Sequence, residues 1–564
     1  MTAAPTPRPL RSPAELQAVM RTDYQVSAQQ WAAISAPLEP AVVVAGAGSG
    51  KTSVMAARVV YLVVTGQVRP DQVLGLTFTT KAAGELRTRV REALEVAGFA
   101  RGTAGEDGSE EVLEPVVATY NAYAAALLTE HGLRIGHEPD TRVIADAARY
   151  QLAGRVIERH EGPVRLLSDS PPHVIEYILA LDGALAEHLV EPAALRAFDA
   201  REAPRFAAEL SGKIAADVAS AFGRRAEATA LVEEYRSFKR SLGLMDFSDQ
   251  ISLAADLADR HPAVGERERE KFRIVLLDEY QDTSVAQALM LRRLFSGSTA
   301  AQGRGHPVTA VGDPNQAIYG WRGASVSNIL GFGLDFPGPD GSPDVATYPL
   351  TVNRRSDRRI LQVANRLAQP LYDGFAQVRP LEPGGDAEGL VQAIVHESYA
   401  EELGWLVTQV RDAHRTSRRA PGERWREIGV LVRDNAHAAD VFDALTAAGV
   451  PVEIVGLKGL LRLPEVSEVL ATLSLVSDLT ANSELLALLS GPRWAVGPRD
   501  LALLGRRARD LAGSRHAPTP AGTVREALAV AVAGADPTEV PALSDGLEDP
   551  GDLPYSLEAQ ERLA

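Results

Sequence analysis

The stretch AVVVAGAGSGKT, residues 41–52, constrains the fold more than any other part of this chain. The β-branched run 42–44 predicts a fully buried strand. Residues 45–50 follow as a loop of small residues whose amides can approach an anion, and Lys51 and Thr52 open a helix. In such an arrangement the amides and the helix N-terminus face phosphates, the lysine supplies a point charge and the threonine hydroxyl binds Mg²⁺. The stretch therefore predicts a nucleoside triphosphate site, and a glycine-rich turn before a surface helix is the weaker alternative.

Two carboxylates follow a second apolar run. Asp278 and Glu279 come directly after residues 274–277, which predict a buried strand. Carboxylates at the end of a strand suit an ATPase, in which Asp278 and Thr52 hold the metal and Glu279 orients or deprotonates the attacking water. Acidic residues at strand ends are common, so the pair indicates an ATPase only because the phosphate loop is also present. The loop residues expected to contact the nucleotide are Ala45, Gly46, Ala47, Gly48, Ser49, Gly50, Lys51 and Thr52, with Ala45 where the usual pattern has glycine.

Composition sets broad limits on the class of protein. A chain of 564 residues is long enough for about three or four domains. The formal net charge of −16 argues mildly against a nucleic-acid partner, although a basic groove can lie on an acidic body. The absence of cysteine excludes disulfides and cysteine-ligated metals within this chain. Because the Pro-rich start has no apolar core and no apolar run is long enough to cross a bilayer, we expect a cytosolic protein without a membrane partner.

Strand and helix patterns alternate along the chain. Apolar runs predict strands at 73–78, 113–119, 272–277 and 308–311, and a helical pattern between 121 and 261 predicts an all-helical insertion, with Ser170 and Pro171 at the start of one helix. This alternation predicts a doubly wound α/β fold with ligands at the carboxyl ends of parallel strands. After a Gly/Pro break at 335–344, further strands at 390–395, 428–432 and 452–455 predict a second α/β lobe. The expected divisions are a flexible tail 1–22, a first lobe 23–120 and 262–345, its insertion 121–261, a second lobe 346–455, and a second helical insertion 456–564.

Five segments resemble, in order, motifs of one known family. AGAGSGKT, TFTTKAAGELRTRV, DEYQDT, VGDPNQAIYGWRGA and NRRS are similar to successive motifs of the UvrD/Rep/PcrA family of superfamily 1 DNA helicases, over roughly residues 26–490. The resemblance implies a RecA-like first lobe, an incomplete second RecA-like lobe, ATP and Mg²⁺ as cofactors, and 3′→5′ movement on single-stranded DNA in repair or recombination. The later stretch LLALLSGPRWAVGPRDLALLGRRAR resembles actinobacterial members, including the AdnB-type motor of helicase–nuclease machines.

The resemblance also implies roles around the nucleotide. Gln30 is similar to the family's adenine-reading glutamine, although a helix-surface glutamine is an equally good interpretation of the sequence. Gln316 resembles the sensor of the γ-phosphate, and Arg355 falls where the family carries an arginine finger from the second lobe. Arg354 stands where the family usually has a tyrosine that stacks on adenine, and a guanidinium plane can also stack on a base.

DNA contacts are expected from three motifs. Tyr319 and Trp321 offer flat faces on which unpaired bases can stack, although core packing is the alternative for Trp321. The basic helix that follows residue 80 either neutralises phosphates or is a solvated face. The residues that the resemblance places at DNA are Phe78, Thr79, Thr119, Tyr120, Tyr319, Trp321 and Arg322.

The family's last two motifs are not found before Ala564, so we expect the chain to be the front part of a longer protein. The predicted partners are single-stranded DNA and its junction with duplex. Two other hypotheses stay open: the motor of an end-resecting helicase–nuclease with a partner subunit, and a non-catalytic, nucleotide-dependent DNA-binding subunit.

Overall fold

The computed structural model describes residues 7–563 except 23–24, 100–102, 105–109, 112, 139–140, 163, 169, 321–322, 376, 418, 420–422, 455–463 and 516–540. The chain forms two compact units, Met1–Gln392 and Ala393–Ala564. Among the helices that the structure describes, none combines the length and the apolar composition that a membrane crossing requires.

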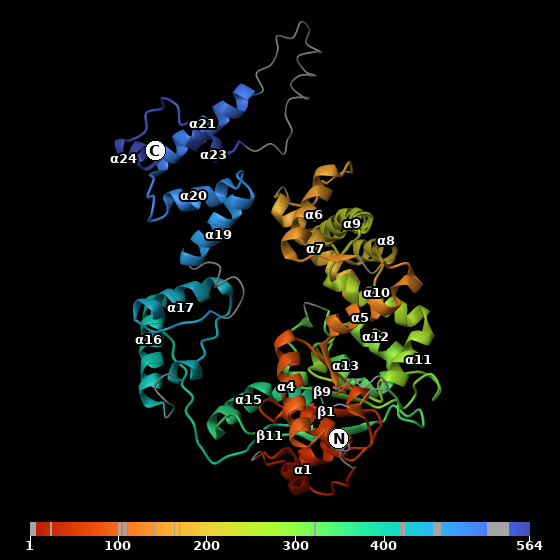
Figure 1. The fold of residues 1–564 in the computed structure, drawn as a ribbon. Helices are drawn as coiled ribbons and strands as arrows, with labels where there is room; N and C mark the ends of the chain where they lie inside the picture. Colours follow the sequence, from red (N-terminus) through yellow and green to blue (C-terminus); the bar gives the residue numbers. More distant parts are fainter. Residues whose placement is uncertain are drawn as a thin grey trace. The chain divides into compact units, whose positions relative to one another are not determined.

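A six-stranded parallel sheet organises the first unit (Figure 1). Its strands are β1 (Ala41–Ala45), β2 (Val73–Thr77), β5 (Val116–Thr119), β8 (Ile274–Leu277), β9 (Val308–Gly312) and β10 (Ala346–Leu350). They lie in the order β10-β1-β9-β8-β2-β5. This sheet confirms the predicted α/β class. Because β1, β9, β8 and β2 are parallel neighbours, the loops that follow them meet at one edge, where such sheets bind ligands.

Helices cover both faces of the sheet, and successive side chains of β1 serve the two cores. Val42 and Val44 belong to one buried cluster, whereas Val43 and Ala45 belong to the other. A strand buried on both faces explains the continuous apolar run in the sequence. One face carries α1 (Pro13–Met20), α2 (Ala28–Ile34), α3 (Lys51–Val64) and α4 (Thr80–Val96); the other carries α5 (Tyr120–His131), α10 (Phe247–Arg260), α11 (Pro262–Lys271), α12 (Val285–Phe295), α13 (Ser327–Leu330) and α14 (Phe332–Asp335).

The helical insertion has a core of its own. It consists of α6 (Asp146–Arg159), α7 (Pro171–Glu187), α8 (Pro192–Glu209) and α9 (Gly212–Ser241), with β6 (Arg142–Val143) and β7 (Leu244–Met245) paired at its base. Ile178, Leu231 and Tyr235 are fully buried in its core. Figure 1 shows these helices grouped beyond α5, α10 and α12, which pack on the sheet. The insertion is therefore narrower than the predicted range 121–261, since α5 and α10 belong to the sheet's core.

Two expectations about the first unit are wrong. Residues 7–22 do not form a loose tail, because α1 is capped by the Ser12 side chain and buries Leu16 and Val19 in the sheet's core. β10, expected to open the second lobe, is instead the edge strand beside β1. Proline is tolerated at an edge, where its missing N–H breaks no ladder, and Pro349 lies there.

After β10 the chain forms β11 (Val352–Asn353), α15 (Arg358–Gly374) and β12 (Glu382–Pro383), with β11 paired to β12. The short β3 (Thr103–Ala104) and β4 (Glu110–Glu111) pair with each other as antiparallel strands.

The second unit is helical in its described residues. It contains α16 (Tyr399–Thr416), α17 (Asn435–Ala447), α19 (Pro464–Ser477), α20 (Asn482–Ser490), α21 (Pro498–Arg515), α23 (Leu543–Glu548) and α24 (Leu557–Leu563). The strands predicted at 390–395 and 428–432 are wrong, because neither segment joins a ladder among the described residues and Leu431 is 99% exposed. Residues 452–454 are not a strand either, and Val455 lies outside the described residues. An apolar run forms a strand only where a neighbouring strand satisfies its amides and carbonyls.

Candidate nucleotide and DNA site

The phosphate loop has the strand–loop–helix geometry that the sequence predicts. β1 ends at Ala45, and α3 begins at Lys51 after Gly50 with φ +88. Within the loop the Ser49 hydroxyl donates to the Gly46 carbonyl at 2.7 Å. Ala45 is the last strand residue, fully buried, and its φ is not positive. Alanine therefore fits the position where the usual pattern has glycine, because this backbone does not need glycine's freedom.

Lys51 and the two carboxylates converge at the edge of the sheet. Lys51 Nζ lies 2.9 Å from Glu279 Oε2. Asp278 is 4% exposed, and burial, with the charge of Glu279 adding to it, raises the pKa of its carboxyl to about 6. Glu279 has φ +49, a left-handed conformation that is strained for a residue with a Cβ. Thr52 follows Lys51 in the first turn of α3. A threonine hydroxyl and carboxylates are the oxygen ligands that Mg²⁺ prefers, so these residues fit the predicted metal.

A hydrogen-bonded network links Gln316 to Glu279. Gln316 Nε2 donates to Asp313 Oδ2 at 2.6 Å. The Asp313 amide donates to Gln281 Oε1 at 3.0 Å, and Gln281 Nε2 donates to Glu279 Oε2 at 2.9 Å. Gln281, 1% exposed, was not among the predicted site residues. The segment DEYQDT could have indicated Gln281 as a site residue, because polar residues continue there beyond the two carboxylates.

The NRRS motif, residues 353–356, lies against the phosphate loop. The Arg354 amide donates to the Gly48 carbonyl at 3.0 Å, and Asn353 Nδ2 donates to the Ala47 carbonyl at 2.7 Å. Asn353 Oδ1 in turn accepts from the Arg355 amide at 2.8 Å. The Arg354 guanidinium donates to the Gln25 carbonyl at 2.6 Å. A groove of about 380 Å³ runs beside these residues. Asn353 was not among the predicted site residues. Its side chain helps to hold the backbone of Arg354 and Arg355 at the phosphate loop.

Gln30 is a buried loop-holding residue in this structure. It is 2% exposed, so the helix-surface alternative is wrong. Its Nε2 donates to the Ser49 carbonyl at 2.9 Å, and its Oε1 accepts from the Ser27 amide at 3.0 Å. The glutamine thus joins α2 to the phosphate loop, and its adenine-reading role stays a prediction.

The predicted DNA residues fall into four groups. Phe78 and Tyr319 stack with centroids 4.7 Å apart and an interplanar angle of 24°, at the loops after β2 and β9. The hydroxyls of Thr79 and Thr119 cap α4 and α5 by accepting from the Ala82 and Ala122 amides.

Tyr120 does not have the exposed face that DNA stacking requires. It is 1% exposed and its hydroxyl donates to the Asp278 carbonyl at 3.1 Å. The DNA contact that the resemblance places at Tyr120 is therefore not made by an exposed ring in this structure. Trp321 and Arg322 lie outside the described residues.

Family models identify the two parts of the chain. Residues 26–337 match the UvrD/REP helicase N-terminal domain, which is more than half of the chain. The chain belongs to the UvrD/REP helicase family. Residues 348–513 match the UvrD-like helicase C-terminal domain. The closer resemblance to AdnB-type motors stays a prediction.

Curated relatives of this UvrD/REP family chain are named helicases. An ATP-dependent DNA helicase PcrA of Leuconostoc citreum is 29% identical over 84% of this chain and 55% of its own length. DNA helicase II of Haemophilus influenzae is 25% identical over 85% of this chain and 58% of its own. The PcrA helicase of Bacillus subtilis is 27% identical over 82% of this chain and 54% of its own length. The chain thus spans a little over half the length of these relatives.

Proposed function

We propose that the protein is an ATP-dependent DNA helicase that moves along single-stranded DNA in the 3′→5′ direction, with Mg²⁺ as cofactor, in DNA repair or recombination in the cytoplasm. One observation carries the proposal: a partly buried hydrogen-bonded path joins the phosphate-loop lysine to the backbone beside the aromatic pair Phe78 and Tyr319. Its nucleotide end is the contact between Lys51 and Glu279. The names of the relatives support the same activity.

The nucleotide end explains how hydrolysis is controlled. In the structure Glu279 is paired with Lys51. We expect the γ-phosphate to take over the lysine, which frees the Glu279 carboxylate to orient the attacking water. Thr52 and Asp278 would hold Mg²⁺, which would supply positive charge to neutralise the phosphates. Arg355, anchored at the loop through Asn353, is placed to stabilise charge that develops during phosphoryl transfer.

The path to DNA runs through DEYQDT. Gln281 Nε2 donates to both Glu279 Oε2 and Asp282 Oδ2, at 2.9 and 3.1 Å. Asp282 Oδ1 accepts from the Ile318 amide at 3.3 Å, next to Tyr319. When Glu279 changes its partner, we expect the side chain of Gln281 to move. That movement reaches the loop that carries Tyr319 through Asp282 and Ile318. The presence of Glu279 also argues against a non-catalytic subunit, since that role does not need a water-orienting carboxylate.

The test is ATP hydrolysis by the full-length protein with and without single-stranded DNA. The wild type should be stimulated by DNA, and Lys51→Ala should lower turnover by at least about 100-fold, the scale of losing one preorganised charge. Lys213→Ala, an exposed lysine on α9, is the control and should behave as wild type. Unwinding of duplexes with a 3′ or a 5′ tail reports the polarity. A rate of hydrolysis indifferent to DNA would refute the proposal.

A further inference from the structure

Glu187 is the last residue of α7 and lies where the insertion meets the sheet-bearing part of the first unit. Its Oε1 accepts from the Ser248 hydroxyl at 3.2 Å, and its carboxylate also accepts from the Ser284 hydroxyl. An anion at the C-terminal end of a helix is unfavourable for that helix, so α7 alone does not account for a glutamate here. The starts of α10 and α12, which carry Ser248 and Ser284, are the ends that favour an anion.

The polypeptide that carries the aromatic residues packs directly on Glu187. Gly323 has φ +77, and a Cβ added there would lie 2.9 Å from Glu187 Cβ and 3.5 Å from His188 Nε2. Ala324 pairs with Ser284 in an antiparallel bridge. Ser284, whose hydroxyl donates to Glu187, is therefore also the residue that pairs with the end of this loop.

The described residues 318–320 and 323–324, here named the aromatic loop, are thus fastened at Ile318 and at Ala324. Its first residue, Ile318, is bound to Asp282, on the path that comes from the nucleotide. Its last residue, Ala324, is bound to Ser284, two positions further along the same segment. The nucleotide path therefore reaches one end of the aromatic loop, and Glu187 reaches the other.

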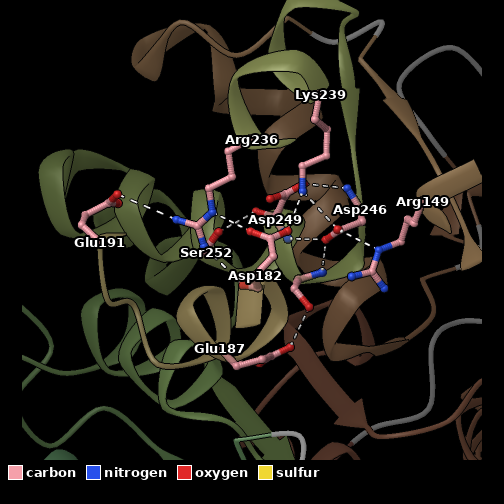
Figure 2. Close-up of polar contacts among 10 residues, drawn as sticks. Arg149, Asp182, Glu187, Glu191, Arg236, Lys239, Asp246, Asp249 and Ser252 are labelled. Atoms are coloured by element: carbon pink, nitrogen blue, oxygen red, sulfur yellow. Dashed lines mark hydrogen bonds and ion pairs between the residues drawn. The ribbon is translucent and has the colours of Figure 1, made fainter. Parts of the chain in front are cut away.

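A buried ionic cluster fixes the end of the insertion against the sheet-bearing part. Lys239 on α9 is 3% exposed and lies 3.1, 3.1 and 2.7 Å from carboxylate oxygens of Asp182, Asp246 and Asp249. Although burial by itself lowers the pKa of Lys239, these carboxylates raise it above its ordinary value. Figure 2 shows these side chains gathered in one cluster, with Glu187, the last residue of α7, beside it. Because Asp182 lies on α7 and Asp249 on α10, the cluster holds the end of α7, and Glu187 with it, in position at the start of α10.

We propose that Glu187 is a positioning residue through which the helical insertion sets the aromatic loop for single-stranded DNA, acting on the loop through Ser284 and Gly323. The inference rests on the proposed helicase function. The insertion supports the loop by way of the end of α7, while the state of the nucleotide reaches it by way of Gln281 and Asp282. The aromatic loop is the place where the two inputs meet.

The test compares Glu187→Ala with wild type in the full-length protein. We expect the oligo-dT concentration that gives half-maximal ATPase stimulation to rise about tenfold, the factor that accompanies loss of a hydrogen bond to a charged group. The KM for ATP without DNA and the DNA-independent turnover should be unchanged, which a general loss of structure would not allow. Glu187→Gln keeps the shape and one acceptor oxygen and should recover most of the DNA response. Glu176→Ala, an exposed glutamate on the same helix, is the matched control.

A double-mutant cycle with Ser284→Ala tests the route. If Glu187 acts through Ser284, the double variant should be no weaker for DNA than the weaker single variant; additive losses overturn the proposal. A half-maximal DNA concentration equal to wild type in both Glu187→Ala and Glu187→Gln overturns it as well. Direct binding of labelled oligo-dT is measured in parallel. If hydrolysis does not respond to DNA in the wild type, the helicase proposal fails, and the binding data still decide on Glu187.

Discussion

Replacing Asp278 by asparagine should stabilise the nucleotide-free protein while abolishing ATP turnover. The carboxyl is almost completely buried beside Glu279, and its pKa is raised from an ordinary 3.8 to about 6. One pKa unit corresponds to about 1.4 kcal/mol. Ionising Asp278 therefore costs the folded state about 3 kcal/mol relative to the unfolded chain. Asparagine has nearly the same shape and carries no charge, so it removes this cost.

The sign and the pH range follow from the raised pKa. The folded chain binds the Asp278 proton more tightly than the unfolded chain does, so the destabilisation is complete above about pH 6 and disappears below about pH 4. At pH 8 the asparagine variant should exceed wild type by up to about 3 kcal/mol in free energy of unfolding. At pH 5 the difference should be roughly half as large.

Urea unfolding of the full-length proteins in EDTA, at pH 5 and pH 8, measures the difference. Asp217→Asn, at an exposed position of α9, is the control and should show no pH-dependent difference from wild type. A wild type as stable as Asp278→Asn at pH 8, or a difference that does not change with pH, would refute the reasoning. Either result would mean that the carboxylate ionises without the cost of burial.

Two further predictions concern the DNA site and the insertion. Trp321→Ala should weaken binding of single-stranded DNA by about 5- to 150-fold, the range for losing one stacked base, without changing ATP affinity in the absence of DNA; unchanged DNA binding in an anisotropy titration would make Trp321 a packing residue. Lys239→Met should lower the free energy of unfolding by about 3–5 kcal/mol, because it removes the cation that three closely spaced carboxylates share; an unchanged Tm in thermal unfolding would contradict this.

The sequence was sufficient where a short segment determines its own structure. The phosphate loop and the carboxylates after β8 are local patterns of strand, turn and helix, and both lie as predicted. The sequence was insufficient where a neighbouring strand or helix determines the structure of a segment. Residues 346–350 were expected in the second lobe, and their pattern does not say which sheet they join. Residues 428–432 read as a strand and have no ladder to join within the described part of the second unit.

Individual side chains show the same limit. Tyr120 carries the family motif, yet its aromatic ring faces the core, which only the packing of α5 reveals. Gln281 was visible as part of a polar motif, but its role requires the position of Asp313 on another strand. Glu187 becomes unusual only when the end of α7 is known, because an acidic residue is ordinary elsewhere on a helix.

The pairing of β10 with β1 has a mechanical consequence for Arg355. The chain runs from this edge strand straight to Asn353 and Arg354, which are bound to the carbonyls of the phosphate loop. The Arg355 backbone is therefore held at the phosphate loop, and both lie within the first unit. We expect the Arg355 guanidinium to engage or leave a terminal phosphate by turning about its own side-chain bonds.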